Sequence, residues 1–560
     1  MLLSKVLSSR AFGSVISRHL LNKSGPDQVR ILAKQATDQK FPLVHYPICR
    51  YPYEKVTDAM AKTATDAVQT GLTLSYKEGE EVLGVMDYYK AYSSGKVTPT
   101  EMMHRVFEGI DKLSFMNMFV AVHRENVLEQ AKTSDERWKG KKPLSVFDGV
   151  PISVKDMVSV KGYQNGSGMV LRESDPISKE DDIMIRRFRE AGAIILGITT
   201  MTEYGRCPLG YNSHYKGPYN PYDETRYSGG SSSGSVVSVM TGLVPIGISF
   251  DGGGSIRLPA ALSGAFGLAP TYGRIPCDSV VFQTSGNIHA GVNTATSTDT
   301  ALAYALLAQN EPEHPLTKLH GLDNAPRPHL AEFDKVDNFA GLRIGIFWDY
   351  FNDSDPEVAA YCKAVANELQ KRGATIVEVS IPHLKELSLA HSLAISVDFS
   401  SLHQDEFYHR DDLEPATKIQ LAIGNTVTGA ELAACKRLRG WAMSYIKQLF
   451  AEKMDVFLTP GCPITAPKLE KGVLRYGESN IPLMKAVMRY IFLVNFAGFP
   501  GMVMPIAYSS QGEGGIGLPI SCQMIADHWN DALLLRLSHF VEKHIFHRRL
   551  PKHHHKLSLD

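Results

Sequence analysis

The sequence lacks the cysteine and histidine patterns of common metal and disulfide proteins. Its seven cysteines are scattered, odd in number and never arranged as C-x-x-C, which argues against a disulfide framework or a zinc site and favours a reducing compartment. The 20 histidines include no H-E-x-x-H pattern. The histidine run at 553–555 lies in a polar tail, where a solvated segment is favoured over weak metal binding. We expect no metal and no cofactor.

An excess of charge and a long apolar run are also absent. Lys+Arg and Asp+Glu number 59 each, so net charge is zero, which argues against a dedicated nucleic-acid binder. The longest apolar region, 490–508, is interrupted by Asn495, Pro500 and Pro505, and therefore favours a buried core segment over a membrane helix. No internal repeat is found. With 44% hydrophobic residues in 560, the chain has an ordinary globular composition.

Residues 1–26 contain no acidic residue, and serine is frequent among them. A basic, serine-rich and acid-poor composition is typical of a mitochondrial transit peptide; a basic membrane-surface segment is the alternative, and plain disorder a third. Two locations therefore stay open: a mitochondrial one, and a cytoplasmic or peripheral-membrane one. The four basic residues are Lys5, Arg10, Arg18 and Lys23. We expect a helical extension over 27–75 and a polar tail over 546–560.

The central chain alternates helices with short apolar strands. Thr98 and Glu101 form a capping box around Pro99, which predicts a helix beginning there. Further helices are predicted at 181–191 and 357–369, and strands at 193–198, 342–348, 374–379 and 456–458. A proline-rich surface excursion is expected at 308–340. This alternation indicates an α/β fold with a mostly buried sheet.

The stretch from Gly229 to Pro259 carries the strongest chemical signal. Two clusters rich in Gly and Ser, at 229–235 and 251–257, enclose an apolar segment. Such loops approach ligands closely and present N–H groups that bind anions. A Gly/Ser linker would be polar throughout, and no G-x-x-x-x-G-K-[ST] phosphate loop is present. We therefore predict a serine nucleophile with an oxyanion hole.

A lysine supplies a candidate base. In the sequence GVPISVKDMV, Lys155 follows the apolar residues Val150, Ile152 and Val154, as at the end of a short buried strand. A surface lysine with a buried stem is the alternative. Burial disfavours the ammonium form and lowers the pKa from its usual ~10.4, as general-base action requires.

These pieces together resemble the amidase signature family. The matching segments are GVPISVKD around Lys155, GGSSSG at 229–234 and DGGGSIRLPA at 251–260, and the resemblance extends over roughly 80–545. It implies an amidase domain at 76–545, in which helices surround a large, mixed, twisted β-sheet core.

The resemblance also implies the roles of individual residues. Ser255 would be the nucleophile, Ser231 the bridging proton carrier and Lys155 the base of a Ser-Ser-Lys triad that forms an acyl-enzyme. A cis peptide would precede Ser231. The backbone amides of Gly252, Gly253, Gly254 and Ser255 would form the oxyanion hole.

Other residues near these motifs have simpler interpretations. Asp251 and Arg257 flank the nucleophile loop and are interpreted as structural partners that hold it. Cysteine nucleophiles at Cys207 or Cys277 are the disfavoured alternative, because neither lies in a comparable donor-rich loop.

Segments outside the signature are similar to the fatty acid amide hydrolases of the plant type, among them NPYDETRYSGGSSSG and LMKAVMRYIFLVNFAGFPGMVMP. This resemblance implies N-acylethanolamines and related long-chain amides as substrates, bound in an apolar channel. A peripheral membrane contact and a homodimer stay open. A helical stripe that could line the channel, or be plain core, comprises Met484, Met488, Ile491 and Phe492.

Three other functions remain open at this point. The A subunit of glutamyl-tRNA amidotransferase shares the signature and would act on glutamine together with partner subunits. A short-chain or aryl amidase would use the same chemistry. A non-catalytic binding protein with the same fold is disfavoured, because Lys155, Ser231 and Ser255 are all present.

Overall fold

The computed structural model describes residues 13–23, 25–47, 49, 56–71, 74–75, 82–278, 286–314, 317, 326–510 and 517–559. The strands among them are β1 Phe119–Ala121, β2 Pro151–Lys155, β3 Ile194–Thr199, β4 Ile246–Asp251, β5 Phe266–Ala269, β6 His289–Thr294, β7 Arg343–Ile346, β8 Thr375–Glu378, β9 Val456–Pro460, β10 Gly501–Tyr508 and β11 Pro519–Ala526.

Within the described residues these 11 strands form one sheet, in the order β1-β3-β2-β4-β6-β5-β10-β11-β9-β7-β8. Strand β2 runs parallel to both β3 and β4, and β7 runs parallel to β8 and β9. The other neighbours are antiparallel. The expected mixed sheet is therefore confirmed. Every residue of β2, β3 and β4 is buried, as expected for strands that are covered on both faces of the sheet.

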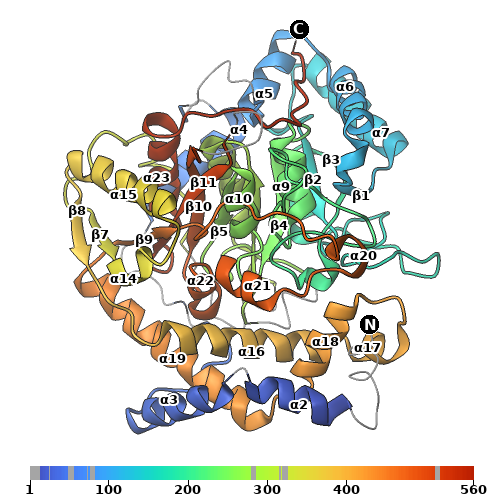
Figure 1. Cartoon of the computed structure of the whole chain (residues 1–560). Helices are drawn as coiled ribbons and strands as arrows, with labels where there is room; N and C mark the ends of the chain where they lie inside the picture. The colour runs from blue at the N-terminus through green and yellow to red at the C-terminus, as the bar shows by residue number, and fades with distance from the viewer. Residues whose placement is uncertain are drawn as a thin grey trace.

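Helices surround the sheet (Figure 1). Their bounds are α2 Gly13–Lys23, α3 Pro26–Asp38, α4 Asp58–Thr70, α5 Val85–Ser94, α6 Pro99–Lys112, α7 Arg124–Lys139, α8 Ile183–Glu190, α9 Ser233–Met240, α10 Arg257–Ser263, α12 Ser297–Leu307, α14 Trp348–Phe351, α15 Pro356–Lys371, α16 Leu384–Leu402, α17 Gln404–His409, α18 Pro415–Gly424, α19 Gly429–Glu452, α20 Val473–Tyr476, α21 Ile481–Val487, α22 Phe492–Ala497 and α23 Asp531–His544, with 3₁₀ turns η1 Ser114–Met116 and η2 Glu203–Gly205.

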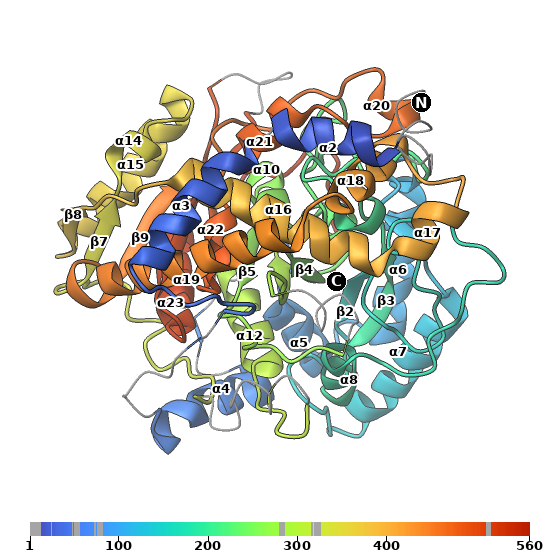
Figure 2. The ribbon, with the colours of Figure 1, turned by 90° about the horizontal axis from the view of Figure 1, so that it is seen from below.

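A separate layer of helices lies below the sheet in Figure 1 and contains α16, α18 and α19. Helices α2 and α3, from the N-terminal end of the chain, lie on its outer side, as the view from below shows (Figure 2). Within the described residues, no helix combines the length and the apolar character needed to cross a membrane.

Several local predictions are confirmed. The Thr98–Glu101 capping box begins α6, with both of its hydrogen bonds formed. Helix α15 and strands β3, β7, β8 and β9 lie where the hydrophobic pattern places them, within a few residues at their ends. The apolar region 490–508 forms α22 and β10, both almost wholly buried.

Two surface predictions differ from the structure. Residues 308–340, expected as a surface excursion, lie partly outside the described residues, but Phe333, Val336 and Phe339 are buried. The expected solvated tail is instead docked: His553 contacts Glu224, and the N–H of His555 donates to the carbonyl of Thr241 at 2.8 Å. The sequence carries few apolar residues in this tail, but one of them, Leu557, is buried and anchors it.

Candidate active site

Two adjacent parallel strands bring the predicted lysine and the nucleophile loop to one edge of the sheet. Strand β2 pairs with β4 through Val154 and Ile248, so their carboxyl ends lie side by side. Lys155 is the last residue of β2, and Asp251 is the last residue of β4. The 252–256 loop follows directly and leads into α10. Because parallel strands end at the same edge, residues distant in sequence meet there.

The Lys155 side chain lies in a buried pocket of hydroxyl groups. Its Nζ donates hydrogen bonds to Ser231 Oγ at 2.8 Å, Ser232 Oγ at 2.9 Å and the Phe250 carbonyl at 3.3 Å. Only 1% of the residue is exposed. Burial lowers the pKa of Lys155 to about 7, although the charge of Asp251 partly opposes the shift. The lysine can therefore exchange a proton with Ser231 near neutral pH.

The serine loop and the nucleophile loop are joined through their backbones. The peptide bond before Ser231 is cis. The N–H of Ser232 donates to the carbonyl of Ser255 at 3.2 Å. Ser231 and Ser255 both line one cavity together with Lys155. The structure thus brings together all three side chains predicted to act in catalysis.

A buried ion pair holds the nucleophile loop. The Asp251 carboxylate accepts the N–H of Gly254 at 2.5 Å and two hydrogen bonds from the Arg257 guanidinium at 3.0 Å. Burial opposes ionisation, but Arg257 holds the pKa of Asp251 well below its usual range. This arrangement confirms both residues as structural partners. Arg257 in turn donates to Ile491 O, Gln523 Oε1 and Asn495 Oδ1.

The glycine loop leaves fewer free amides than predicted. Among the described residues, the N–H groups of Gly252, Gly253 and Ser255 have no acceptor. Gly254 differs, because its N–H is bound by Asp251. Its backbone has a φ of +116°, and an added Cβ would lie 2.1 Å from Ile491 Cγ2. Gly254 therefore has a structural role in the turn, and three predicted donors remain available.

The predicted substrate-binding stripe is only partly present. Met484, Met488 and Phe492 line the cavity. Ile491 is fully buried and lies under Gly254 instead. The continuous helix that the spacing requires does not form, since α21 ends at Val487 and α22 begins at Phe492. Met484 and Phe492 therefore lie on two separate short helices, and Met488 and Ile491 lie in the turn between them.

The alternative cysteine nucleophiles are poorly suited to catalysis. Cys207 is buried, and burial raises the pKa of its thiol to about 11. Cys277 is also buried, and its Sγ donates to Asp182 Oδ2 at 3.1 Å. Burial of Cys207 therefore disfavours its reactive thiolate form.

The cavity at the serines has a volume of about 1450 Å³. Helix α16 contributes much of its wall, which sequence reasoning missed because no motif marks this helix. His391 of α16 donates from Nε2 to the carbonyl of Gly252 at 2.9 Å, and burial lowers its pKa to about 4. A neutral histidine of α16 thus supports the glycine loop at Gly252. Apolar residues along the cavity wall include Leu384, Leu389, Ile395, Phe399, Ile419 and Ile423.

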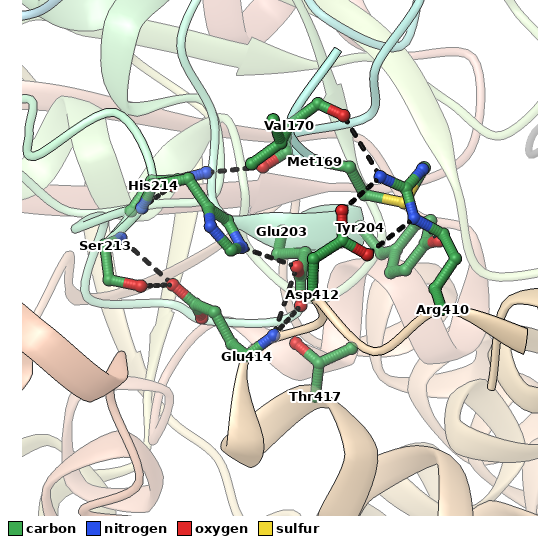
Figure 3. A network of polar contacts seen from close by, with 12 residues as sticks. Met169, Val170, Glu203, Tyr204, Ser213, His214, Arg410, Asp412, Glu414 and Thr417 are labelled. Carbon is green, nitrogen blue, oxygen red and sulfur yellow. Dashed lines mark hydrogen bonds and ion pairs between the residues drawn. The ribbon is translucent and has the colours of Figure 1, made fainter. Parts of the chain in front are cut away.

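A buried polar network fixes the turn beside Ser231 (Figure 3). The Glu203 carboxylate accepts the N–H of Glu414 at 3.0 Å and lies 2.9 Å from His214 Nε2. Glu414 stands at the start of α18 and accepts the Ser213 hydroxyl at 2.7 Å. Glu203 belongs to the η2 turn, in which Tyr204 and Gly205 line the cavity, and an added Cβ on Gly205 would lie 3.1 Å from Ser231 Oγ. The network therefore connects the turn that lies beside Ser231 to the start of α18. No sequence motif marks it.

Comparisons with known proteins agree on one family. The model of the amidase family matches residues 102–535 of this chain. A fatty acid amide hydrolase of Medicago truncatula is 33% identical over 82% of this chain and 76% of its own length. The A subunit of a glutamyl-tRNA(Gln) amidotransferase of Psychrobacter is 28% identical over 79% of this chain and 91% of its own length. A solved 6-aminohexanoate cyclic dimer hydrolase has the same fold, with a TM-score of 0.74, 22% identity and coverage of 85% of this chain and all of that one.

Proposed function

This chain belongs to the amidase family of amide-hydrolysing enzymes, and we propose that it cleaves long-chain fatty acid amides, such as N-acylethanolamines, through a Ser-Ser-Lys triad. The observation that carries the proposal is the buried contact of 2.8 Å between Lys155 Nζ and Ser231 Oγ, at the wall of a large cavity that Ser255 also lines.

The first half-reaction would form an ester on Ser255. Its Oγ attacks the amide carbonyl carbon while its proton passes to Ser231 Oγ, and Ser231 gives its own proton to neutral Lys155 Nζ. Negative charge gathers on the carbonyl oxygen, where the N–H groups of Gly252, Gly253 and Ser255 can donate to it. A lysine whose pKa is lowered to about 7 is neutral in a large fraction of molecules at neutral pH, as this step requires.

Collapse of the tetrahedral intermediate would complete the first half-reaction: the C–N bond breaks, and the proton held by Lys155 returns through Ser231 to the departing amine. In the second half-reaction water would attack the acyl ester, and its proton would pass through Ser231 to Lys155. Collapse of this second intermediate breaks the ester bond, and the proton returns through Ser231 to Ser255 Oγ, which frees the carboxylic acid and Ser255. The Asp251–Arg257 pair takes no proton in this scheme; it keeps the glycine loop in position.

Two observations support a long acyl chain as substrate. Drug-sized ligands occupy pockets of roughly 300–1,000 Å³, and the cavity here measures about 1450 Å³. Much of its wall is aliphatic and aromatic, and Met484, Met488 and Phe492 contribute to it. The similar protein from Medicago truncatula is named a fatty acid amide hydrolase. A long acyl chain would occupy more of such a cavity, and contact more of its apolar wall, than glutamine would.

A substrate panel tests the proposal. We expect a higher kcat/KM for palmitoylethanolamide than for glutamine or for a short aryl amide, and no turnover by Ser255→Ala. Faster turnover of glutamine would favour the function of an amidotransferase component, and faster turnover of the aryl amide would favour a short-chain amidase. A Val15→Ala variant is a suitable control, because Val15 is 69% exposed and lies outside the cavity lining.

A further inference from the structure

The N-terminal helices are joined to the enzyme by an apolar core. Helix α2 contacts α18, and helix α3 contacts α16 and α19, as Figure 2 shows from below. Leu21, Val29 and Leu32 are buried in a cluster shared with residues of α16 and α19. Much of the stretch whose composition predicts a targeting segment is therefore folded onto the catalytic body, although residues 1–12 lie outside the described part of the chain.

A buried carboxylate clasps both helices. Glu431, with a side chain 1% exposed, receives two hydrogen bonds of 2.8 Å from the Arg18 guanidinium and an ion pair from Arg30. The same carboxylate completes the capping box of α19 with Thr428. Burial opposes its ionisation, but the hydrogen bonds of Arg18 and Thr428 hold the pKa of Glu431 at about 2. The Glu431 clasp is thus a charged contact between α2, α3 and the start of α19.

This clasp also gives the basic composition of the segment a second explanation. The buried Glu431 carboxylate on α19 needs a cation from the segment that packs over it. That cation is supplied by Arg18, which lies in the acid-free stretch 1–26. A positive charge here therefore serves the fold, whatever it does for targeting.

The same helices reach the substrate cavity. Leu20, Leu21 and Lys23 of α2 and Gln28 of α3 line it, together with Lys155, Ser231 and Ser255. Leu20 also packs against the small apolar cluster that contains Tyr204, the residue next to Gly205 in the η2 turn. A continuous path of contacts therefore runs from α2 to the catalytic serines.

We propose that helix α2, held by the Glu431 clasp, forms a wall of the acyl-chain chamber and that Leu20 determines which chain lengths are accepted. The proposal rests on the function proposed above for Ser255. An acyl chain long enough to reach Leu20 gains aliphatic contacts there and loses contact with water. A bulkier side chain at this position leaves less space for such a chain, whereas a short chain does not reach it and is unaffected.

The test uses alkyl fluorophosphonates of short and long chain length, whose phosphorus is attacked by the active serine. The measured quantity is the ratio of the long-chain to the short-chain labelling rate. We expect Leu20→Trp to lower this ratio by about tenfold or more, since small changes of volume in an apolar pocket change recognition by that order. Leu20→Ala should change the ratio in the other direction for the longest chains. Val15→Trp on the same helix should leave it unchanged.

The outcomes separate this inference from the proposed function. Absence of any label on Ser255 in the unmodified protein would contradict the proposed function. Labelling of Ser255 with the same chain-length ratio in the unmodified protein, Leu20→Trp and Leu20→Ala would overturn the inference alone. If the tryptophan variant fails to fold, the alanine variant decides.

The clasp is tested separately. Arg18→Met keeps the aliphatic stem but removes the charge, and should alter the labelling ratio and speed tryptic cleavage within α2 and α3. Lys34→Met, an exposed position on α3, is the matched control and should do neither. If Arg18→Met accelerated cleavage but left the labelling ratio unchanged, α2 would cover the cavity without influencing which chain lengths it accepts.

Discussion

The pH dependence of acylation follows directly from the burial of Lys155. The lysine must be neutral to accept a proton, and its pKa is lowered from 10.5 to about 7. At a pH of about 8, a base with that pKa is roughly nine-tenths neutral, whereas an unshifted lysine would be neutral in only about 0.3% of molecules. At this pH the fraction of molecules with a neutral Lys155, able to accept a proton, is therefore roughly 300-fold larger than for an unshifted lysine.

The assay is the rate of Ser255 labelling by a fluorophosphonate, measured across a range of pH. We expect the rate to rise with pH, because protonated Lys155 cannot act as a base, and to level off above the apparent pKa near 7. His391 titrates lower, with a pKa of about 4, so it does not produce this rise. Lys155→Met should reduce the plateau by about 10²–10⁴-fold, the usual contribution of a general base.

A specific result would refute this reasoning. If the logarithm of the rate increased steadily up to a pH of about 10, the active base would have an ordinary lysine pKa. Burial of Lys155 would then not explain how the enzyme works near neutral pH. A profile that Lys155→Met left unchanged would exclude this lysine as the base altogether.

The remaining predictions concern the scaffold of the site. Arg257→Met leaves a buried carboxylate without its cation and should lower the free energy of unfolding by about 3–5 kcal/mol in a denaturant titration; a loss within experimental error would contradict the ion-pair argument. Gly254→Ala places a Cβ against a core side chain and should lower Tm strongly, whereas Gly472→Ala, with open space around it, should not. Burial alone would lower the pKa of His214, but the hydrogen bond and charge of Glu203 outweigh burial and raise the pKa above its usual value. Glu203→Gln should therefore lower that pKa in a histidine NMR titration; an unchanged pKa would show that Glu203 does not stabilise the imidazolium.

Sequence patterns predicted those parts of the structure that depend on near neighbours. The apolar run before Lys155 predicts a buried strand, and the capping box at Thr98 places a helix start. The density of glycine and serine around Ser231 and Ser255 predicts tight loops with available donors. In each case the physical cause lies within a few residues, so reading along the chain is sufficient.

Other features depend on partners far away in sequence and could not be predicted. Arg18 meets Glu431 only because α2 folds back onto α19. His391 supports the carbonyl of Gly252 from a helix without any motif. The spacing of Met484 and Ile491 suggested one helix, but the chain breaks between them, and Ile491 packs under Gly254 instead. The spacing of apolar residues predicts that they are buried, but it does not predict which part of the structure they pack against.

The most direct test of the account is to locate the acyl group during turnover. The enzyme is mixed with palmitoylethanolamide, quenched in acid and digested, and the peptides are analysed by mass spectrometry. The account predicts palmitate as an ester on Ser255 and none in Ser255→Ala. Palmitate on Ser231 or on Cys207, or turnover that persists in Ser255→Ala, would contradict it.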